Sequence, residues 1–246
     1  MSPKGAAARS VFRSKLTQQR SRERAEQILD IAAAELLDVR DAEKVTTTWL
    51  STKAKMPVAT IYRYFADRWA IFAALIDRQI DNVDRELLKD LRAVETVTLV
   101  GVFTVFMEAH FRHFSANSAA AAVWFGARGS DVVRLRVRER CNEMAHWIQD
   151  GAAAAGLADE FPPWGGEALI WTADRAFEVM FRVERSEEER RAIFDEALEM
   201  MGNQLEKYAT PAGLEGIPAR EFLIAAGPFK SAGDTHMVTA SSLPAR

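Results

Sequence analysis

Apolar residues recur at helical spacing along most of this chain, and this periodicity constrains its fold more than any other feature of the sequence. Ile28, Ala32 and Leu36, for example, lie on one face of an amphipathic helix that is predicted to start near Ser21. Later helices are predicted over residues 96–115, 131–155, 166–184 and 187–208. The chain is therefore predicted to be all-α.

Local signals support these helix boundaries. Gly156 is suited to ending a helix, and Ser186 and Glu189 have the spacing of a capping box at the start of the next one. Residues 134–138 alternate with period two, as a strand would, but the apolar stripe from Val133 to Ile148 has helical spacing and exceeds strand length. This segment is therefore predicted to be helical.

A tight turn is predicted at Lys55, Met56 and Pro57. Pro57 is tolerated in the first turn of a helix but not in its interior, so residues 46–54 and 58–65 must form two separate short helices. Asp67 is a suitable cap for a further helix. Two short helices joined by a tight turn, after a longer helix, favour a helix-turn-helix.

Charge is distributed unevenly along the chain. The net charge is −3, yet residues 1–24 hold 7 basic residues and 1 acidic residue, and residues 1–72 hold 13 and 8. A basic end on an acidic chain is typical of a nucleic-acid contact, because lysine and arginine neutralise phosphates. A solvated basic leader is the alternative, and residues 1–21 are predicted to be a flexible arm in either case.

The composition excludes several classes of protein. With 246 residues, 48% of them hydrophobic and 27% charged, the sequence is typical of a globular protein. One cysteine, Cys141, and four histidines do not support a disulfide framework or a zinc finger. No apolar run reaches the roughly 18 residues of a membrane span, and the basic N-terminus is unlike a signal peptide. We therefore expect a cytoplasmic protein.

The N-terminal motifs resemble those of a known family. Ile28 to Ala32, Thr46-Thr47, the string Thr60-Ile61-Tyr62-Arg63-Tyr64-Phe65 and the segment from Asp67 to Phe72 are similar to the DNA-binding domain of the TetR family of bacterial transcriptional regulators. The resemblance covers residues 22–82. The sequence departs from the family pattern in the turn, where Lys55 replaces a glycine and Pro57 replaces a capping serine or threonine.

The resemblance implies a domain organisation. Residues 22–82 would form a three-helix DNA-binding domain with the helix-turn-helix motif at 46–65, and residues 83–208 a larger helical domain for ligand binding and dimerisation. Residues 209–246 contain four of the eight prolines without periodicity and are predicted to be a disordered tail. The implied function is that of a homodimeric repressor, released from a palindromic double-stranded DNA operator by a small effector.

The implied DNA contacts belong to the two short helices and the residue that opens the next one. The segment 58–65 would be the recognition helix, with its first residues nearest the base edges and the tyrosines and arginines at phosphates. The candidate residues are Thr46, Thr47, Val58, Ala59, Thr60, Tyr62, Arg63, Tyr64 and Arg68. Tyr64 is equally suited to the hydrophobic core.

Aromatic residues and methionine are abundant in the second half of the chain. They are compatible with a cavity for an apolar or aromatic effector, although at helical spacing such residues more often form ordinary core. The candidate ligand-binding residues are Phe106, Met107, His110, Trp124, Phe125, Trp147, Trp171 and Phe177. The dimer is predicted to form through the helices at 166–184 and 187–208. In the second of these, Ile193 to Tyr208 carry apolar residues in four-residue steps with one three-residue step, including Met201, that suit both the core and an interface.

Two other functions compete with this interpretation. Glu143 and His146 have the spacing of carboxylate-bridged metal bundles, and His110 and His113 share one helix, which would suit a metal-dependent enzyme. Such a bundle needs a second Glu-x-x-His, and the sequence has none. The altered turn also allows a chain that has lost DNA binding and acts through a protein partner. We expect neither an enzyme nor a bound metal or cofactor.

Overall fold

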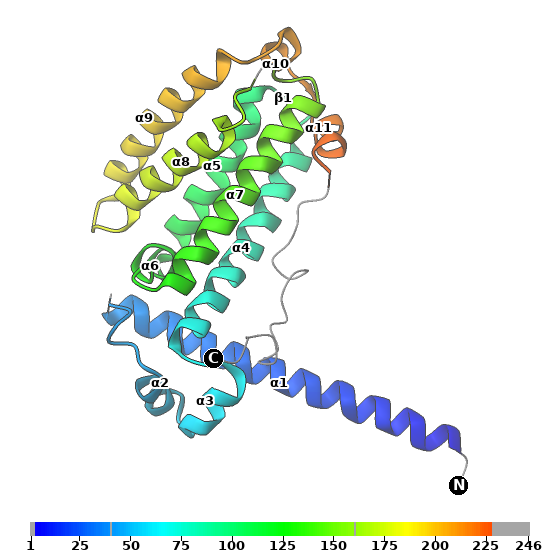
Figure 1. The fold of residues 1–246 in the computed structure, drawn as a ribbon, viewed down its shortest axis with the longest axis vertical. Helices are drawn as coiled ribbons and strands as arrows, with labels where there is room; N and C mark the ends of the chain where they lie inside the picture. Colours follow the sequence, from blue (N-terminus) through cyan, green and yellow to red (C-terminus); the bar gives the residue numbers. More distant parts are fainter. Residues whose placement is uncertain (1–2, 40, 160, 228–246) are drawn as a thin grey trace.

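The computed structural model describes residues 3–39, 41–159 and 161–227, and this part of the chain is almost entirely helical (Figure 1). Its helices are α1 (Pro3–Val39), α2 (Thr47–Ala54), α3 (Val58–Tyr64), α4 (Arg68–Ala93), α5 (Leu99–Ala116), α6 (Ser118–Gly126), α7 (Asp131–Ala154), α8 (Gly165–Phe181), α9 (Glu187–Glu206), α10 (Pro211–Glu215) and α11 (Ala219–Ala226). The strands β1 (Thr96–Val97) and β2 (Ile217–Pro218) form one short antiparallel pair. The expected all-α class is confirmed.

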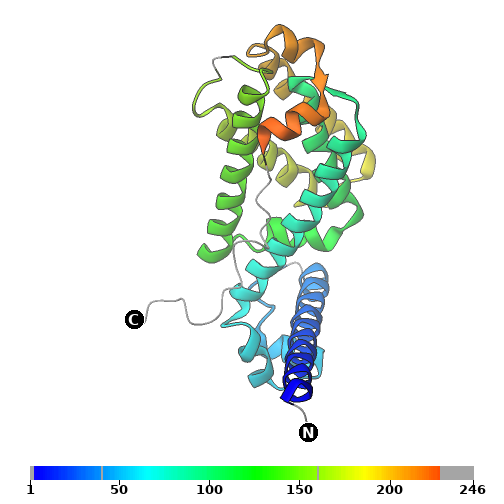
Figure 2. The same cartoon turned by 90° about the vertical axis from the view of Figure 1, so that its right-hand side faces the viewer.

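The first three helices and the start of α4 share one hydrophobic core. Ile28 and Leu36 of α1, Leu50 of α2, Ile61 of α3 and Phe72 of α4 are at most 1% exposed. α1 packs against both α2 and α4, and α2 packs against α3. Figure 2 shows this small helical unit at one end of the molecule, with the larger helical domain above it. The predicted three-helix N-terminal arrangement is confirmed.

α1 begins much earlier than the sequence pattern indicated. We expected an irregular arm over residues 1–21 and a helix from Ser21, whereas the helix starts at Pro3. Proline is well tolerated in the first turn of a helix, and alanine, arginine, lysine and glutamine have high helix propensity. The first half of α1 projects away from the other helices (Figure 1), so propensity and continuation of the helix account for it without an apolar face.

α4 connects the N-terminal unit to the larger C-terminal domain. It packs on α1 at its beginning and on α5, α7 and α11 further along, while α8 lies between α7 and α9 (Figure 1). The predicted helices correspond to α5, α7, α8 and α9, with boundaries within a few residues. The part of the chain described here contains no helix with both the length and the apolar composition of a membrane span.

The local signals in the C-terminal domain act as predicted, with two additions. Gly156 follows α7 with φ 69°, and Ser186 and Glu189 form both hydrogen bonds of the capping box. Residues 134–138 are helical within α7. Thr98 starts α5 later than predicted, and α6 is a separate helix that Asn117 caps by accepting from the N–H of Ala120 at 3.0 Å.

The predicted disordered tail is wrong for residues 209–227. This segment contains α10, β2 and α11, and α11 packs against α7. Phe222 is 0% exposed and its ring lies 5.5 Å from that of Trp147. The proline and glycine content concealed a short apolar helix that buries its face on an existing surface. The rest of the predicted tail, residues 228–246, lies outside the described residues.

Candidate functional site

The turn between α2 and α3 keeps the geometry expected of a helix-turn-helix, although Lys55 stands where glycine is usual. Lys55 has φ 51° and ψ 42°, in the left-handed region, and its N–H donates to the carbonyl oxygen of Thr52 at 3.3 Å. The N–H of Met56 donates to the carbonyl oxygen of Ser51 at 3.1 Å, and the Ser51 hydroxyl donates to the Met56 carbonyl at 2.6 Å. A side chain at this φ costs about 1 kcal/mol. The turn is therefore strained and not rebuilt.

The beginning of α2 and the middle of α3 present a pair of hydroxyl groups together. Thr47 Oγ1 and Tyr62 Oη are 3.1 Å apart, and Tyr62 is 52% exposed. Thr46 has a different role, because its hydroxyl accepts from the N–H of Trp49 at 3.1 Å and caps α2. Thr47 and Tyr62, two of the predicted phosphate contacts, therefore place their hydroxyl groups side by side at the surface.

Arg63 and Tyr64 are neighbours at the end of α3. Nη2 of Arg63 donates to the Tyr64 hydroxyl at 3.1 Å, and the guanidinium lies 5.0 Å from the centre of the Tyr64 ring. Arg63 is exposed, whereas Tyr64 is half-buried against the core. Tyr64 is therefore partly packed on the core, as one of the two alternatives predicted, and its ring also lies against the exposed Arg63.

Arg68 is engaged with the turn that precedes α2. Its Nη1 donates to the backbone carbonyl of Glu43 at 2.7 Å, and its Nη2 forms an ion pair with the Glu43 carboxylate. The guanidinium also lies 4.5 Å from the centre of the Trp69 ring, and the side chain is only 23% exposed. A phosphate would have to compete with Glu43 for this arginine.

The first turn of α3 offers small apolar groups. Ala59 is exposed, Val58 and Thr60 are half-buried, and Ile61 is fully buried in the core. Pro57 precedes the helix with φ −58° and supplies no side-chain cap. These residues present methyl groups at the surface and few hydrogen-bonding groups.

A cluster of polar contacts links α2 to α1. The Glu35 carboxylate accepts from Nε1 of Trp49 at 2.7 Å and from Nζ of Lys53 at 2.9 Å. Lys53, together with Trp49, holds the pKa of Glu35 below its usual range. The positive charge of Lys53 is therefore matched within the N-terminal domain.

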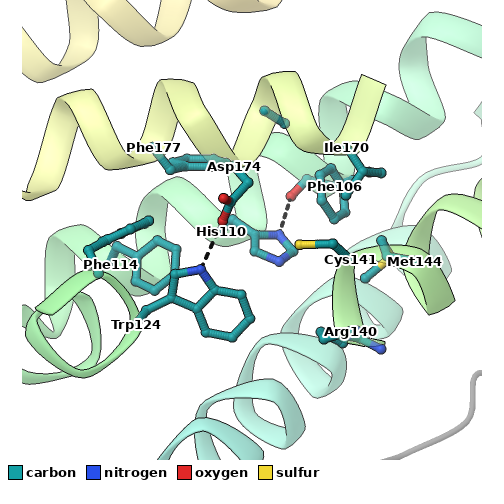
Figure 3. Close-up of a pocket in the computed structure, with 12 residues that line it drawn as sticks. Phe106, His110, Phe114, Trp124, Arg140, Cys141, Met144, Ile170, Asp174 and Phe177 are labelled. Atoms are coloured by element: carbon teal, nitrogen blue, oxygen red, sulfur yellow. Dashed lines mark hydrogen bonds between the residues drawn. The ribbon is translucent and has the colours of Figure 1, made fainter. Parts of the chain in front are cut away.

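The C-terminal domain encloses a small cavity of about 30 Å³ between α5, α6, α7 and α8 (Figure 3). Five of the eight predicted ligand-binding residues line it. They are Phe106, His110, Trp124, Phe125 and Phe177. The structure thus gathers residues that are up to 71 positions apart in the sequence around one space.

The other three predicted ligand-binding residues lie elsewhere. Met107 is buried in the core, Trp147 packs on Phe222 of α11, and Trp171 is 36% exposed on the outside of α8. None of them is among the residues that line the cavity. Helical spacing shows that a residue lies on an apolar face, but it does not show which neighbouring helix that face contacts.

Several lining residues were not predicted as part of the site. They are Phe114, Arg140, Cys141, Met144, Ile170, Ala173 and Asp174. The apolar stripe from Val133 to Ile148 contains Cys141 and Met144, so the sequence carried a signal for these two. Arg140 and Asp174 had no such signal, because polar residues enter a core only where tertiary structure supplies partners.

Ion pairs across helices border the cavity. Asp174 of α8 accepts from Nε1 of Trp124 at 3.0 Å and from both Nη atoms of Arg128 at 2.6 and 2.9 Å. Arg140 of α7 forms an ion pair with Asp84 of α4, and both residues are 4% exposed. Burial raises the pKa of Asp84 to about 7, and the charge of Arg140 opposes this shift.

Burial also keeps the other titratable cavity residues uncharged. The pKa of His110 falls to about 3 and that of Cys141 rises to about 12, in both cases because the charged form would lose its hydration. The imidazole and the thiol are therefore neutral near pH 7, so neither of them places a formal charge at the cavity.

The geometry does not support the metal-dependent enzyme. His146 is exposed and its Nδ1 lies 2.7 Å from the Asn142 carbonyl, while Glu143 is 3.8 Å from Arg140. His113 points elsewhere, with Nε2 3.0 Å from Oε1 of Gln79. Across residues 3–39, 41–159 and 161–227, no three histidine, cysteine, aspartate or glutamate side chains are arranged to hold a metal ion.

The outer surface of α8 and α9 carries several exposed apolar residues. Trp164 just before α8, Val179 in α8 and Met200 in α9 are 65%, 44% and 58% exposed. A hollow of about 260 Å³ lies there between Trp164, Met200 and Tyr208. Met201 is only 3% exposed, so it belongs to the core and not to the surface that we had expected it to share.

Comparison with known proteins identifies the fold. No protein-family model matches the sequence, and comparison with curated proteins finds no match. Among solved structures, the fatty acid degradation regulator FadR from Bacillus halodurans is similar with a TM-score of 0.59 and 14% identity, over 73% of this chain and 94% of that one. A proposed transcriptional regulator from Pseudomonas aeruginosa is similar with a TM-score of 0.53 and 14% identity, over 76% and 94%.

A TetR family transcriptional regulator from Chloroflexus aurantiacus is similar with a TM-score of 0.47 and 14% identity, over 76% of this chain and 89% of that one. The two higher scores show that this chain has the fold of solved transcriptional regulators, with a helical N-terminal domain followed by a larger helical domain. The fold expected from the sequence resemblance is therefore confirmed.

Proposed function

We propose that this protein is a DNA-binding transcriptional regulator, a repressor that leaves a palindromic operator when a small apolar or aromatic effector binds its C-terminal domain. The observation that carries the proposal is the helix-turn-helix itself. α2 and α3 meet at a left-handed Lys55, and α3 presents Tyr62 and Arg63 on its exposed side. This is the arrangement in which a recognition helix enters the major groove.

The division of labour on this surface follows from its chemistry. Ala59 and the half-buried Val58 present methyl groups, which suit apolar contact with thymine methyls in the major groove. The paired hydroxyls of Thr47 and Tyr62 and the guanidinium of Arg63 suit phosphate oxygens. The operator would therefore be read by few hydrogen bonds to bases and positioned by several to the backbone.

Dimerisation is part of the proposal. One short recognition helix contacts too few base pairs for useful specificity, so a second half-site about one helical turn away is required. The exposed apolar residues Trp164, Val179 and Met200 lie over α8 and α9, where a second copy would bury them. With a two-fold axis through this face, the patch on one copy would contact the same patch on the other copy.

Effector binding would act on DNA affinity through α6. This helix supplies Trp124 and Phe125 to the cavity, and it also packs against α1 of the N-terminal domain. A ligand that prefers a different position of α6 would therefore favour a different placement of α1. The change in DNA affinity cannot exceed the difference in ligand affinity between the two states.

In vitro selection from randomised duplexes, followed by anisotropy titrations, tests the proposal. Arg63→Ala should lower affinity for the selected duplex about tenfold and reduce the slope of log affinity against log salt by about 1, because one phosphate contact is lost. Arg92→Ala is the matched control. It removes the same exposed charge at the far end of α4, and it should change neither quantity.

The outcome separates the proposal from its competitors. Equal binding of Arg63→Ala and Arg92→Ala at several salt concentrations contradicts the assigned recognition surface. Failure to enrich any duplex, with no salt-dependent DNA binding by the parent chain, favours the protein-partner function instead.

A further inference from the structure

The cavity in the C-terminal domain is lined by a ring nitrogen that accepts no hydrogen bond from the described residues. Its walls are mainly the rings of Phe106, Phe114, Trp124 and Phe177. Both Asp174 oxygens accept hydrogen bonds from Arg128, at 2.6 and 2.9 Å, and Arg140 is held by Asp84. The charged groups at the border of the cavity are thus engaged with one another.

This ring nitrogen atom is Nε2 of His110. The ring nitrogen Nδ1 lies 2.9 Å from the carbonyl oxygen of Phe106, and a carbonyl can only accept, so Nδ1 carries the hydrogen. Because burial lowers the pKa of His110 to about 3, the ring is neutral and Nε2 has a free lone pair. Nε2 is therefore an acceptor, and none of the described residues donates to it.

The position of this atom directs it toward the cavity. His110 lies inside the domain, yet its side chain keeps some accessible surface because it lines the cavity. Figure 3 shows the ring between Trp124 and Cys141, with Nδ1 turned to Phe106 and the opposite edge turned away from it. A buried acceptor without a donor is costly, so this edge of the ring is suited to a donor that comes from outside the chain.

We propose that the cavity binds a small uncharged phenol whose hydroxyl donates a hydrogen bond to Nε2 of His110. The aromatic walls suit a flat ring in edge-to-face contact. A carboxylate would find no unengaged cation among the described lining residues, and a buried ion without a partner is strongly disfavoured. A phenol, like a tyrosine side chain, is uncharged at pH 7.

Access and the required enlargement involve two rings. The cavity of about 30 Å³ holds little more than one water-sized molecule, whereas a hollow of about 390 Å³ lies on the other side of Phe114 and Phe125, which line both spaces. The two ring centres are 5.3 Å apart. Rotation of Phe125 would join the spaces, and Leu37 of α1 borders the outer one.

This inference rests on the proposed function only for its regulatory meaning, because it identifies the effector class of a regulator. A phenol that displaces α6 would alter the contact of α6 with α1. Ligand binding itself is a property of the C-terminal domain and is measured without DNA.

Calorimetric titration of the full chain with phenol, anisole and benzoate tests the proposal. Anisole keeps the ring but lacks the hydroxyl donor, and benzoate is charged. Phenol should bind about tenfold more tightly than anisole, the ratio expected for one hydrogen bond, and benzoate should not bind. Anisole or benzoate binding as tightly as phenol overturns the proposal, and so does a parent chain that does not bind phenol.

His110→Met and His146→Met form a matched pair of variants. Both histidines have Nδ1 near the carbonyl four residues earlier, at 2.9 and 2.7 Å, but His146 is exposed and outside the cavity. His110→Met should bind phenol and anisole equally, and His146→Met should keep the preference. Retention of the preference in a folded His110→Met overturns the proposal.

A spectroscopic measurement on the unmodified chain covers the case in which His110→Met does not fold. With ¹⁵N-labelled histidine, phenol should shift the Nε2 resonance of one neutral imidazole, and anisole should not. No shift on saturation with phenol overturns the proposal. If phenol binds in this way but leaves DNA affinity unchanged, the inference stands and the regulatory part of the proposed function fails.

Discussion

The helix-turn-helix surface and the cavity differ in how far apart in the sequence their interacting residues are. On the surface, Thr47 pairs with Tyr62 over 15 positions and Arg68 with Glu43 over 25. Around the cavity, Arg128 pairs with Asp174 over 46 positions and Arg140 with Asp84 over 56. Short separations leave a motif in the sequence, whereas long ones depend on helix packing.

The two sites also differ in their exposure to water. The candidate DNA contacts are exposed or half-buried, so each ion pair there can be exchanged for a phosphate at little cost. The cavity pairs are buried, and breaking one leaves a charge in a medium of low polarity. Substitutions should therefore alter binding at the surface and stability around the cavity.

The largest effect is expected for a substitution in the C-terminal domain that breaks the proposed dimer and thereby weakens DNA binding by the N-terminal domain. Met200→Glu would place a charge from each copy into the proposed dimer interface, so the chain should become monomeric and lose operator affinity by at least about a hundredfold. Sedimentation and anisotropy measure the two changes.

Ile224→Glu is the matched control for this prediction. Ile224 is 70% exposed on α11, which lies on the other side of the domain from α9 (Figure 1). If this control also becomes monomeric, or if Met200→Glu remains a dimer, the assigned interface is wrong.

The pH dependence of stability should have opposite signs in the two regions. The pKa of Asp84 rises from 3.8 to about 7 on folding, so the folded state holds an additional proton between these values and stability falls as pH rises from 4 to 7. The pKa of Glu35 is lowered from 4.5, so its contribution is present above this value and is lost at more acidic pH.

Urea unfolding of Asp84→Asn and Glu35→Gln at several pH values checks these signs. Relative to the parent chain, Asp84→Asn should become more stable as pH rises from 4 to 7. The deficit of Glu35→Gln should shrink as pH falls below 4.5. If the stability of Asp84→Asn relative to the parent chain instead declines between pH 4 and 7, the charge of Arg140 outweighs desolvation in setting the pKa of Asp84.

A smaller effect is expected at the strained turn. Lys55→Gly relieves a left-handed backbone that costs about 1 kcal/mol, and part of this gain is offset by the greater freedom of glycine in the unfolded chain. The net expectation is stabilisation of about 0.5 kcal/mol, measured by thermal unfolding. Thr52→Gly, within the α2 helix, should destabilise the chain by a few tenths of a kcal/mol. If both substitutions changed stability in the same direction, the result would contradict backbone strain at Lys55.

The smallest expected effect concerns the ion pair of Arg68. Glu43→Gln removes the carboxylate that competes with phosphate for this arginine, so operator affinity should rise about threefold at low salt and less at high salt. Glu215→Gln, which makes the same charge change on α10, should have no effect. Unchanged affinity in Glu43→Gln would place Arg68 outside the DNA contact.

The success of the sequence predictions follows this difference between the regions. The turn at Lys55, the cap at Ser186 and the end of α7 before Gly156 were predicted, because each is decided within a few residues. The start of α1 at Pro3 and the helix α11 were missed. The start of α1 was missed because its residues have helix propensity but no apolar periodicity. The helix α11 was missed because its apolar face has only a few residues, which packing on α7 stabilises.

The predicted binding residues show the same limit. Tyr62 and Arg63 are exposed on α3 as expected, whereas Trp147 and Trp171 lie outside the cavity to which they were assigned. Adjacent methionines differ as well, since Met200 is 58% exposed and Met201 is 3% exposed. A rotation of about 100° per residue separates these two positions, and only the packed neighbours decide which one is covered.

The sequence by itself determined the helical class, the helix-turn-helix motif and most helix boundaries, because periodicity, caps and turn residues act over distances shorter than one or two helical turns. The tertiary structure decided which aromatic residues surround the cavity, that Asp84 meets Arg140, and that Nε2 of His110 is left as an acceptor. These outcomes depend on how α4, α5, α6, α7 and α8 pack, and burial makes polar pairing across helices obligatory only after that packing exists.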